Sequence, residues 1–220
     1  MTLTEENYIK SIYQLGKYGV HTVSTNSIAD ALETKASSVT DMMKKLAEKG
    51  YVNYKKYQGV NLTIKGGEIA ADIVRKHRLW EVFLVEKLNF SWDEIHEIAE
   101  QLEHIKSEKL IHELDKFLNY PSHDPHGDPI PNKFGAIKKT EKILLFNLSE
   151  NTKAVCVGVK DTSSAFLKYL DKHKIALGSE IIILSREDFD NSMVIKIGEN
   201  LISISQIVAS NLFVKECNTI

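Results

Sequence analysis

Cysteine is scarce in this chain, and long apolar runs are absent from it. The two cysteines among 220 residues, Cys156 and Cys217, stand in no spacing typical of metal or redox sites, so we expect plain core or surface positions in a reducing compartment. No run of about 18 apolar residues occurs, and the N-terminus MTLTEENYIK lacks the features of a signal peptide. We therefore expect a cytoplasmic protein with no membrane association.

Signatures of catalysis are also missing. The sequence contains no phosphate loop, dinucleotide fingerprint or nucleophile elbow. The stretch HEIAE at 96–100 is like a zinc-protease helix only in part, because that motif needs a second histidine where this chain has Glu100. We expect no enzyme activity and no small-molecule substrate.

All four prolines lie in one segment, YPSHDPHGDPIPNKFG at 120–135. Such a segment cannot form regular helix or a central strand, so it is interpreted as a fixed loop leading to a linker. Before it, the spacing of apolar residues predicts helices over 4–18, 24–32, 35–50, 65–88, 91–105 and 107–118. The surplus apolar surface of the last three favours a homodimer.

After Lys142 the pattern changes to short β-like runs separated by turn residues. The runs are ILLFNL, KAVCVGV, GSEIIIL, SMVIKI and LISISQIVASNLFV, with one helical piece at 163–173. This pattern predicts a small β-barrel. The expected fold class is therefore mainly α with a small β domain.

The first third of the chain has the order of a winged helix-turn-helix. Three helices precede YVNYKKYQGVNLTI at 51–64, whose alternation around Gln58-Gly59 predicts a hairpin. Through residue 65 there are nine lysines and six acids, although the whole chain has a net charge of −2. In such a fold the third helix enters the major groove and the wing follows the phosphates. The alternative is a small helical domain with a solvated lysine face.

The candidate DNA contacts lie on the third helix and the hairpin. Basic side chains there would neutralise phosphates, and short polar side chains at the helix start would be nearest to base edges. The first group is Lys35, Lys44, Lys55 and Lys56, and the second is Ser37, Ser38, Thr40 and Asp41. Ser37 is alternatively a simple helix cap.

Histidines and carboxylates gather on two consecutive predicted helices. On the helix over 91–105, an arc of about 100° contains His96, Glu100, Glu103 and His104. His77 and Glu81 form an i, i+4 pair on the preceding helix. Imidazole and carboxylate without thiolate suit Mn²⁺, Fe²⁺, Co²⁺, Ni²⁺ or Zn²⁺. A charged, solvated helix face is the alternative interpretation.

Several longer motifs carry a family resemblance. TEENYIKSIYQL, SSVTDMMKKLAEKGYV, RKHRLWEVFL, EQLEH and DPHGDPIP, in this order, resemble the diphtheria-toxin-repressor family of metal-dependent regulators. The tail after about residue 142 resembles the SH3-like (FeoA-like) domain of its longer members. The resemblance implies a winged helix-turn-helix domain at 1–65, a helical metal-binding and dimerisation domain at 66–140, and an SH3-like domain at 141–220.

The resemblance also implies a function. Such a protein is a homodimeric transcriptional repressor that binds double-stranded operator DNA when loaded with Mn²⁺ or Fe²⁺, and that controls metal-uptake genes. A winged-helix regulator of another ligand, a metalloenzyme and a metal-storage protein are the alternatives.

The ligand set is implied residue by residue. Glu100, Glu103 and His104 match ligands on the family's metal helix, and His77, Glu81 and His96 match ligands of the neighbouring or shared metal site. Iron-sensing members have cysteine where this chain has Glu100, and this favours the manganese branch.

Two positions depart from the family's ligand pattern. Asn7 replaces a helix-one ligand with a neutral amide oxygen, and Lys10 replaces an acidic ligand of the manganese branch. In the tail, Asp161 is the candidate carboxylate. We expect the metal to relieve carboxylate repulsion, to join helix one through Asn7, and to set the DNA-reading heads about 34 Å apart.

Overall fold

The computed structural model describes residues 1–138 and 141–217, which form two compact units. Unit one comprises Met1–Trp80, Ala99–Tyr120 and Ile130–Lys138, and unit two comprises Glu81–Ile98, Pro121–Pro129 and Lys139–Ile220. The expected domain boundary after residue 140 falls on a position outside the described residues. None of the helices in the described part of the chain is both long and apolar enough to span a membrane.

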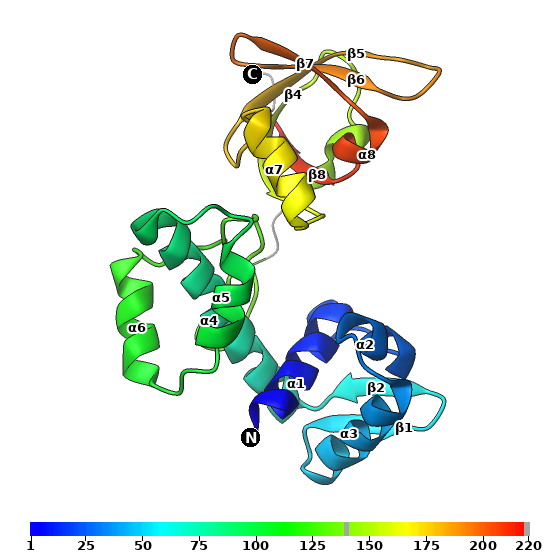
Figure 1. Ribbon diagram of the computed structural model, residues 1–220, viewed down its shortest axis with the longest axis vertical. Helices are drawn as coiled ribbons and strands as arrows, with labels where there is room; N and C mark the ends of the chain where they lie inside the picture. The colour runs from blue at the N-terminus through cyan, green and yellow to red at the C-terminus, as the bar shows by residue number, and fades with distance from the viewer. Residues whose placement is uncertain (139–140, 218–220) are drawn as a thin grey trace. The chain divides into compact units, whose positions relative to one another are not determined.

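Unit one begins with a winged helix-turn-helix. Helices α1 (Leu3–Leu15), α2 (Thr25–Ala31) and α3 (Ala36–Glu48) precede the strands β1 (Val52–Lys55) and β2 (Gly59–Leu62). The two strands pair antiparallel, as the alternating pattern predicts (Figure 1). Gly59 has a φ of +87°, and a Cβ there would lie 2.6 Å from the carbonyl oxygen of Val23. Only glycine therefore fits where the hairpin meets the segment before α2.

The core of the winged helix-turn-helix contains apolar residues from all three helices and from the hairpin. Fully buried members include Ile9, Ile12, Ile28, Val39, Met43, Leu46 and Val60. Helix α4 (Ile64–Leu88) contributes Ala70 and Val74 to the same core. Because α1 presents one face to this core, its other side chains are available for polar contacts.

Two further helices follow α4, and the first is shorter than expected. Helix α5 spans Ile95–Leu102, so the predicted helix over 91–105 was too long at both ends. Ser91 and Glu94 hydrogen-bond to each other in the turn before α5. Glu103 and His104 lie in the turn after α5. Helix α6 (Glu108–Phe117) is joined to α4 by an ion pair of 2.6 Å between Arg75 and Asp115.

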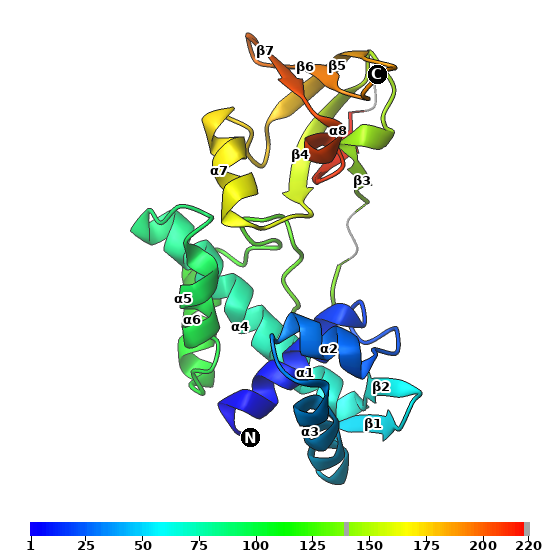
Figure 2. The same ribbon diagram turned by 45° about the vertical axis from the view of Figure 1, so that its right-hand side comes forward.

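Unit two contains a six-stranded antiparallel sheet with the order β3-β8-β4-β5-β6-β7. Figure 2 labels all of these strands except β8. The strands are β3 (Ile143–Leu144), β4 (Lys153–Val159), β5 (Glu180–Arg186), β6 (Met193–Ile197), β7 (Asn200–Ile204) and β8 (Leu212–Glu216). The run LISISQIVASNLFV is not one strand, because the short helix α8 (Gln206–Ala209) separates β7 from β8. These elements agree with the expected SH3-like β domain, and the described strand pairings do not close the sheet into a barrel.

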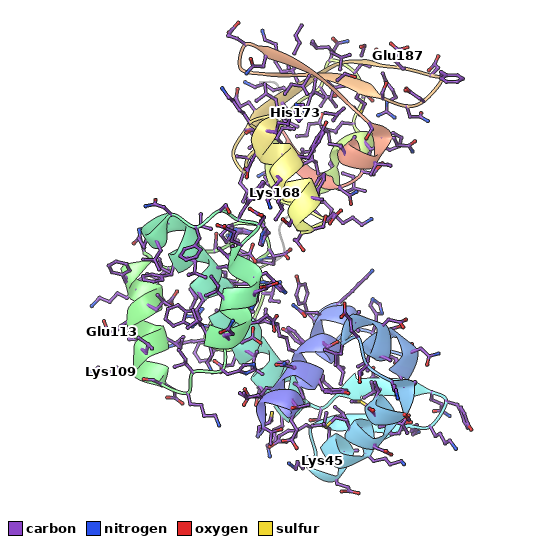
Figure 3. All side chains as sticks on the ribbon, viewed as in Figure 1. Lys45, Lys109, Glu113, Lys168, His173 and Glu187 are labelled. Atoms are coloured by element: carbon purple, nitrogen blue, oxygen red, sulfur yellow. The ribbon has the colours of Figure 1, made fainter. Side chains whose placement is uncertain are left out.

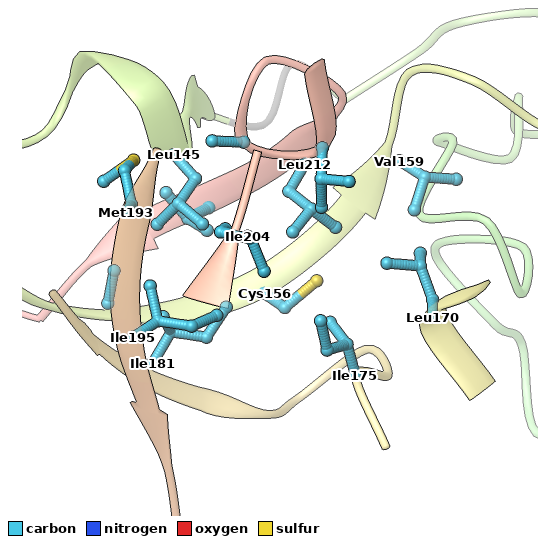
Figure 4. Packing of buried hydrophobic residues seen from close by; sticks show 14 of the residues in the cluster. Leu145, Cys156, Val159, Leu170, Ile175, Ile181, Met193, Ile195, Ile204 and Leu212 are labelled. Atoms are coloured by element: carbon cyan, nitrogen blue, oxygen red, sulfur yellow. The ribbon is translucent and has the colours of Figure 1, made fainter. Parts of the chain in front are cut away.

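Helix α7 (Ser164–Lys172) supplies one apolar face to the core of the sheet domain (Figure 4). Its residues Phe166, Leu167 and Leu170 are buried there, and Trp92 packs against the same core. Cys156 is also buried in it, and burial raises the pKa of its thiol to about 11. A protonated, enclosed thiol is unreactive, which agrees with the plain core position that we expected for Cys156.

Candidate metal centre and nucleic-acid interface

In unit one, three residues from α4 and the α5 region form a potential ligand group. His77, Glu100 and Glu103 each offer one ligand atom, and these atoms lie within 4.8 Å of one another. Glu103 is completely buried and His77 is nearly so. Lys10 of α1 extends into the same group, with Nζ 2.5 Å from Oε1 of Glu100 and 2.6 Å from Oε2 of Glu103.

His104 lies beside this group and is oriented by α1. Its Nδ1 donates to Oε2 of Glu6 over 2.6 Å, so the lone pair of the neutral ring is on Nε2. Nε2 lies 3.8 Å from Oε1 of Glu103. A carboxylate that holds one ring nitrogen while the other faces a ligand is the usual second layer of a metal-binding histidine.

Oε1 of Glu103 and Oδ1 of Asn7 are buried side-chain oxygens of unit one that have no hydrogen-bond partner among the described residues. Leaving such atoms unpaired costs about 1–3 kcal/mol each, so a cation bound there would remove an energetic penalty. The carboxylate oxygen of Glu103 and the imidazole nitrogen of His104 lie 3.8 Å apart and are donors that suit Mn²⁺ or Fe²⁺, so these two residues fit such an ion. The amide oxygen of Asn7 is a donor of the same kind.

Unit two contains a second potential ligand group, formed by Glu81, Asp124 and His126. All three are buried, and their ligand atoms lie within 4.8 Å of one another. Nδ1 of His126 is 3.8 Å from Oε1 of Glu81, and Nε2 of the same ring donates to the carbonyl oxygen of Trp92 over 2.9 Å. The contact with Trp92 leaves the lone pair on Nδ1, toward Glu81. Nδ1 of His96 also lies 3.8 Å from Glu81, on a ring that is 64% exposed.

The loop that carries Asp124 and His126 is shaped by its own side chains and by β4. Oδ1 of Asp124 accepts from the backbone N–H groups of His126 and Asp128, both over 2.9 Å. Gly127 has a φ of +83°, and a Cβ on it would lie 2.1 Å from the carbonyl oxygen of Val157. The sheet domain therefore packs directly on this loop.

The predicted ligands are thus divided between the two units. Asn7, His77, Glu100, Glu103 and His104 belong to unit one, and Glu81 and His96 belong to unit two. The sequence reasoning missed four residues that contact them: Glu6, Lys10 as an ion-pair partner, Asp124 and His126. Asp161 lies outside the ligand groups found among the described residues, and its Oδ1 accepts from the backbone N–H of Ser163.

The candidate DNA surface is formed by the start of α3 and by the hairpin. The exposed residues of this surface are Lys35, Ser37, Ser38, Asp41, Lys44, Lys55 and Lys56. Thr40 is half-buried, and its hydroxyl donates to the carbonyl oxygen of Ala36. The N-cap of α3 is Lys35, without a side-chain cap, so the alternative role of Ser37 as the helix cap is wrong.

Lys45 of α3 and Lys49, the C-cap of this helix, form ion pairs with α1. Nζ of Lys45 lies 2.9 Å from Oε1 of Glu5, and Nζ of Lys49 lies 2.6 Å from the same oxygen. The side chain of Glu5 is buried at the start of α1. Hydrogen bonds from Lys49 and Lys45 lower the pKa of Glu5 from 4.5 to about 2. Figure 3 marks Lys45 on α3. Helix α1 is thus bound to α3 through Glu5 and to residues 100–104 through Glu6 and Lys10.

Comparison with known proteins agrees with this architecture. The domain families described as iron-dependent repressor N-terminal DNA-binding domain, iron-dependent repressor metal-binding and dimerisation domain, and FeoA domain match residues 1–60, 63–132 and 143–216. A solved manganese-dependent transcriptional repressor in complex with manganese is 31% identical, with a TM-score of 0.86 over 96% of this chain and 99% of that one.

Two relatives match over shorter stretches. An HTH-type transcriptional regulator of Methanocaldococcus jannaschii is 39% identical over 118 residues, which are 54% of this chain and 94% of that protein. The iron-dependent repressor IdeR of Mycobacterium leprae is 35% identical over 128 residues, or 58% of this chain. The match spans only about half of IdeR, 55% of its length.

A winged helix-turn-helix beside clustered carboxylates and imidazoles defines the class of metal-responsive DNA-binding regulators. The chain belongs to the iron-dependent repressor family, which includes the diphtheria toxin repressor. The resemblance seen in the sequence motifs is therefore confirmed. Members of this family are transcriptional repressors rather than enzymes.

Proposed function

We propose that this protein is a cytoplasmic transcriptional repressor that binds operator DNA as a homodimer when loaded with Mn²⁺ or Fe²⁺, and that it controls metal-uptake genes. The observation that carries the proposal is the arrangement of Glu6, His104 and Glu103. His104 is held by α1 so that Nε2 faces a buried oxygen of Glu103 that has no hydrogen-bond partner. That geometry prepares two ligand atoms for a cation.

Two sets of residues would hold metal. In unit one they are Asn7, Glu103 and His104, and in unit two they are Glu81, Asp124 and His126, with His96 beside Glu81. A bound dication would supply positive charge that neutralises the buried carboxylates. The donors are mostly oxygen and contain no thiolate, which favours manganese over softer metals.

Helix α1 provides a physical connection between the metal centre and the DNA-reading helix. Glu6 contacts the ligand residue His104, and Glu5 on the same helix pairs with Lys45 of α3 and with Lys49, the C-cap of α3. Any change in how α1 packs on residues 100–104 is therefore transmitted to α3. A coupling free energy of about 1–3 kcal/mol would change operator affinity several-fold to a hundred-fold.

The exposed residues of α3 and the hairpin would contact the operator. Lys35, Lys44, Lys55 and Lys56 would neutralise phosphates, and Ser37, Ser38 and Asp41 are available to base edges. Helix α6 exposes Leu110 and Phe117, apolar side chains of the kind that a homodimer covers. Two-fold symmetry would match two operator half-sites one helical turn apart.

Operator binding in the presence and absence of metal tests this proposal. A duplex selected from a random library with the Mn²⁺-loaded protein would be titrated with protein in Mn²⁺, Fe²⁺, Zn²⁺ or excess chelator, with fluorescence anisotropy as the readout. We expect Mn²⁺ or Fe²⁺ to raise the affinity several-fold to a hundred-fold. Binding that ignores the chelator would contradict the proposal.

Two variants connect the response to the ligand residues. His104→Ala and Glu103→Gln should abolish the metal response of the folded protein. His112→Ala is the matched control, since this exposed histidine lies on α6 in the same unit. An unchanged Mn²⁺ response in His104→Ala would show that the ligand assignment is wrong.

A further inference from the structure

We propose that the ammonium group of Lys10 is a built-in cation that takes the place of one divalent ion at His77, Glu100 and Glu103. Those three residues form a ligand group by distance alone, since their donor atoms lie within 4.8 Å of one another. The inference rests on the proposed function, because it assumes that these three residues would hold a metal ion if the ammonium of Lys10 were absent.

The ammonium lies where these donor atoms converge. Its Nζ is 2.5 Å from Glu100, 2.6 Å from Glu103 and 3.2 Å from Nδ1 of His77. The side chain of Lys10 is 5% exposed and that of Glu103 is fully buried. A buried ammonium requires anionic partners, and these two carboxylates provide them.

A dication and this ammonium cannot occupy the position together. An ion bound by the same three donor atoms would need the space that Nζ fills, and it would meet a positive charge at contact distance. The residues therefore do not fit a metal at this position while Lys10 is in place. Lys10 therefore determines both the charge and the occupant of this position.

Glu103 separates this position from the one that remains open to metal. Its Oε2 contacts Lys10 and His77, and its Oε1 faces Nε2 of His104 at 3.8 Å without a hydrogen-bond partner. One carboxylate thus bridges an internal cation and a position suited to a divalent ion. Unit one would therefore bind a single ion, on the side of Asn7 and His104.

The presence of an ammonium group in place of a metal ion has a consequence for the metal-free protein. Lys10 belongs to α1, and its partners lie 90 and 93 positions further along the chain. A chelator cannot remove a covalently attached ammonium. The contacts of Lys10 with Glu100 and Glu103 therefore connect α1 to this region without metal. Only the connection through His104 would respond to metal binding.

Three variants of the full chain test the assignment. Lys10→Glu supplies an acidic ligand, Lys10→Met removes the charge with little change in size, and Lys76→Met is the control. Lys76 is a mostly buried lysine of α4 that pairs with Asp72 instead of the ligand group. Bound Mn²⁺ per chain at saturation would be counted by equilibrium dialysis, and amide exchange of α1 would be measured in chelator.

We expect Lys10→Glu to bind one more Mn²⁺ per chain than the natural sequence. In chelator, the amides of α1 in Lys10→Met should exchange more than about tenfold faster, because the buried carboxylate of Glu103 and the partly buried one of Glu100 lose their counter-ion. Lys76→Met should match the natural chain in both measurements. An equal Mn²⁺ count in Lys10→Glu, or unchanged α1 exchange in Lys10→Met, would overturn the assignment.

The same measurements separate this inference from the proposed function. A natural chain that binds no Mn²⁺ would refute the proposed metal response. The exchange of α1 in chelator would still decide whether Lys10 acts as the internal cation, since that comparison contains no metal.

Discussion

Oε2 of Glu6 lies 2.6 Å from Nδ1 of His104, although the two residues are 98 positions apart in the sequence. The neighbouring residue Glu5 is also buried, and it pairs with Lys45 of α3 and with Lys49, the C-cap of α3. Two consecutive carboxylates of α1 therefore serve different purposes. One orients a candidate metal ligand, and the other holds the DNA-reading helix.

This division predicts different effects of two adjacent substitutions. Glu6→Gln should weaken Mn²⁺ binding about 10- to 100-fold, because His104 loses the carboxylate that fixes its orientation. Glu5→Gln, the matched control, should leave the Mn²⁺ affinity unchanged. Isothermal titration with Mn²⁺ would measure both, and equal affinities in the two variants would contradict the role assigned to Glu6.

Two substitutions of Asp124 test its negative charge and its hydrogen bonds to the loop separately. Asp124→Asn keeps the oxygen that accepts from His126 and Asp128, so the free energy of unfolding without metal should fall by less than about 1 kcal/mol. Asp124→Ala leaves both N–H groups unpaired and should cost about 1–3 kcal/mol. Both variants should lose one Mn²⁺ per chain.

Urea unfolding and equilibrium dialysis would measure these two effects. An unchanged Mn²⁺ count in Asp124→Asn would show that the carboxylate serves only the loop.

Acid should weaken the connection between α1 and α3. Hydrogen bonds from Lys49 and Lys45 lower the pKa of Glu5 from 4.5 to about 2, so the folded protein favours the ionised carboxylate. A lowered pKa stabilises the fold above pH 4.5, and this contribution disappears as the pH falls toward 2. The free energy of unfolding should fall less steeply in Glu5→Gln over this range.

Urea titrations at several pH values between 5 and 2 would give the free energy of unfolding of the natural chain and of Glu5→Gln at each pH. Glu48→Gln is the control for general acid effects, because Glu48 is an exposed carboxylate at the end of α3. Parallel stability curves for the natural chain and Glu5→Gln would exclude the Glu5 contribution.

Salt dependence should identify the lysines that contact phosphate. The double variant Lys55→Ala, Lys56→Ala should weaken binding to all duplexes and should reduce the slope of log K against log salt by about 2. The control is the double variant Lys109→Ala, Lys116→Ala, which removes two exposed lysines of α6 (Figure 3 labels Lys109). An equal loss of slope in the control would argue against the hairpin as the DNA contact.

The order of helices and strands could be predicted from the sequence because it depends on local periodicity. The alternation at 51–64 predicted the hairpin that the structure forms at Val52–Lys55 and Gly59–Leu62. Periodicity failed at 91–105, where the side chain of Glu94 pairs with Ser91 before α5 begins. It also failed near 205, where apolar spacing alone does not distinguish a strand from the short helix α8.

The candidate site was only partly predictable for a different reason. DPHGDPIP contains a carboxylate and an imidazole, but its prolines indicated only a fixed loop. What makes Asp124 and His126 a candidate site is contact with Glu81, more than 40 positions earlier in the chain. Similarly, Lys10 was recognised as unable to bind metal, but its contact with Glu100 and Glu103 was not expected.

The sequence by itself determined the winged-helix head, the helical and β domains, and the supply of imidazole and carboxylate donors, since neighbouring residues encode these through spacing and composition. Only the tertiary structure decided which donors meet, which ring nitrogen faces a carboxylate, and that an ammonium lies between Glu100 and Glu103. The physical reason is that contacts across 90 or more positions depend on how whole helices pack, and no local pattern records that packing.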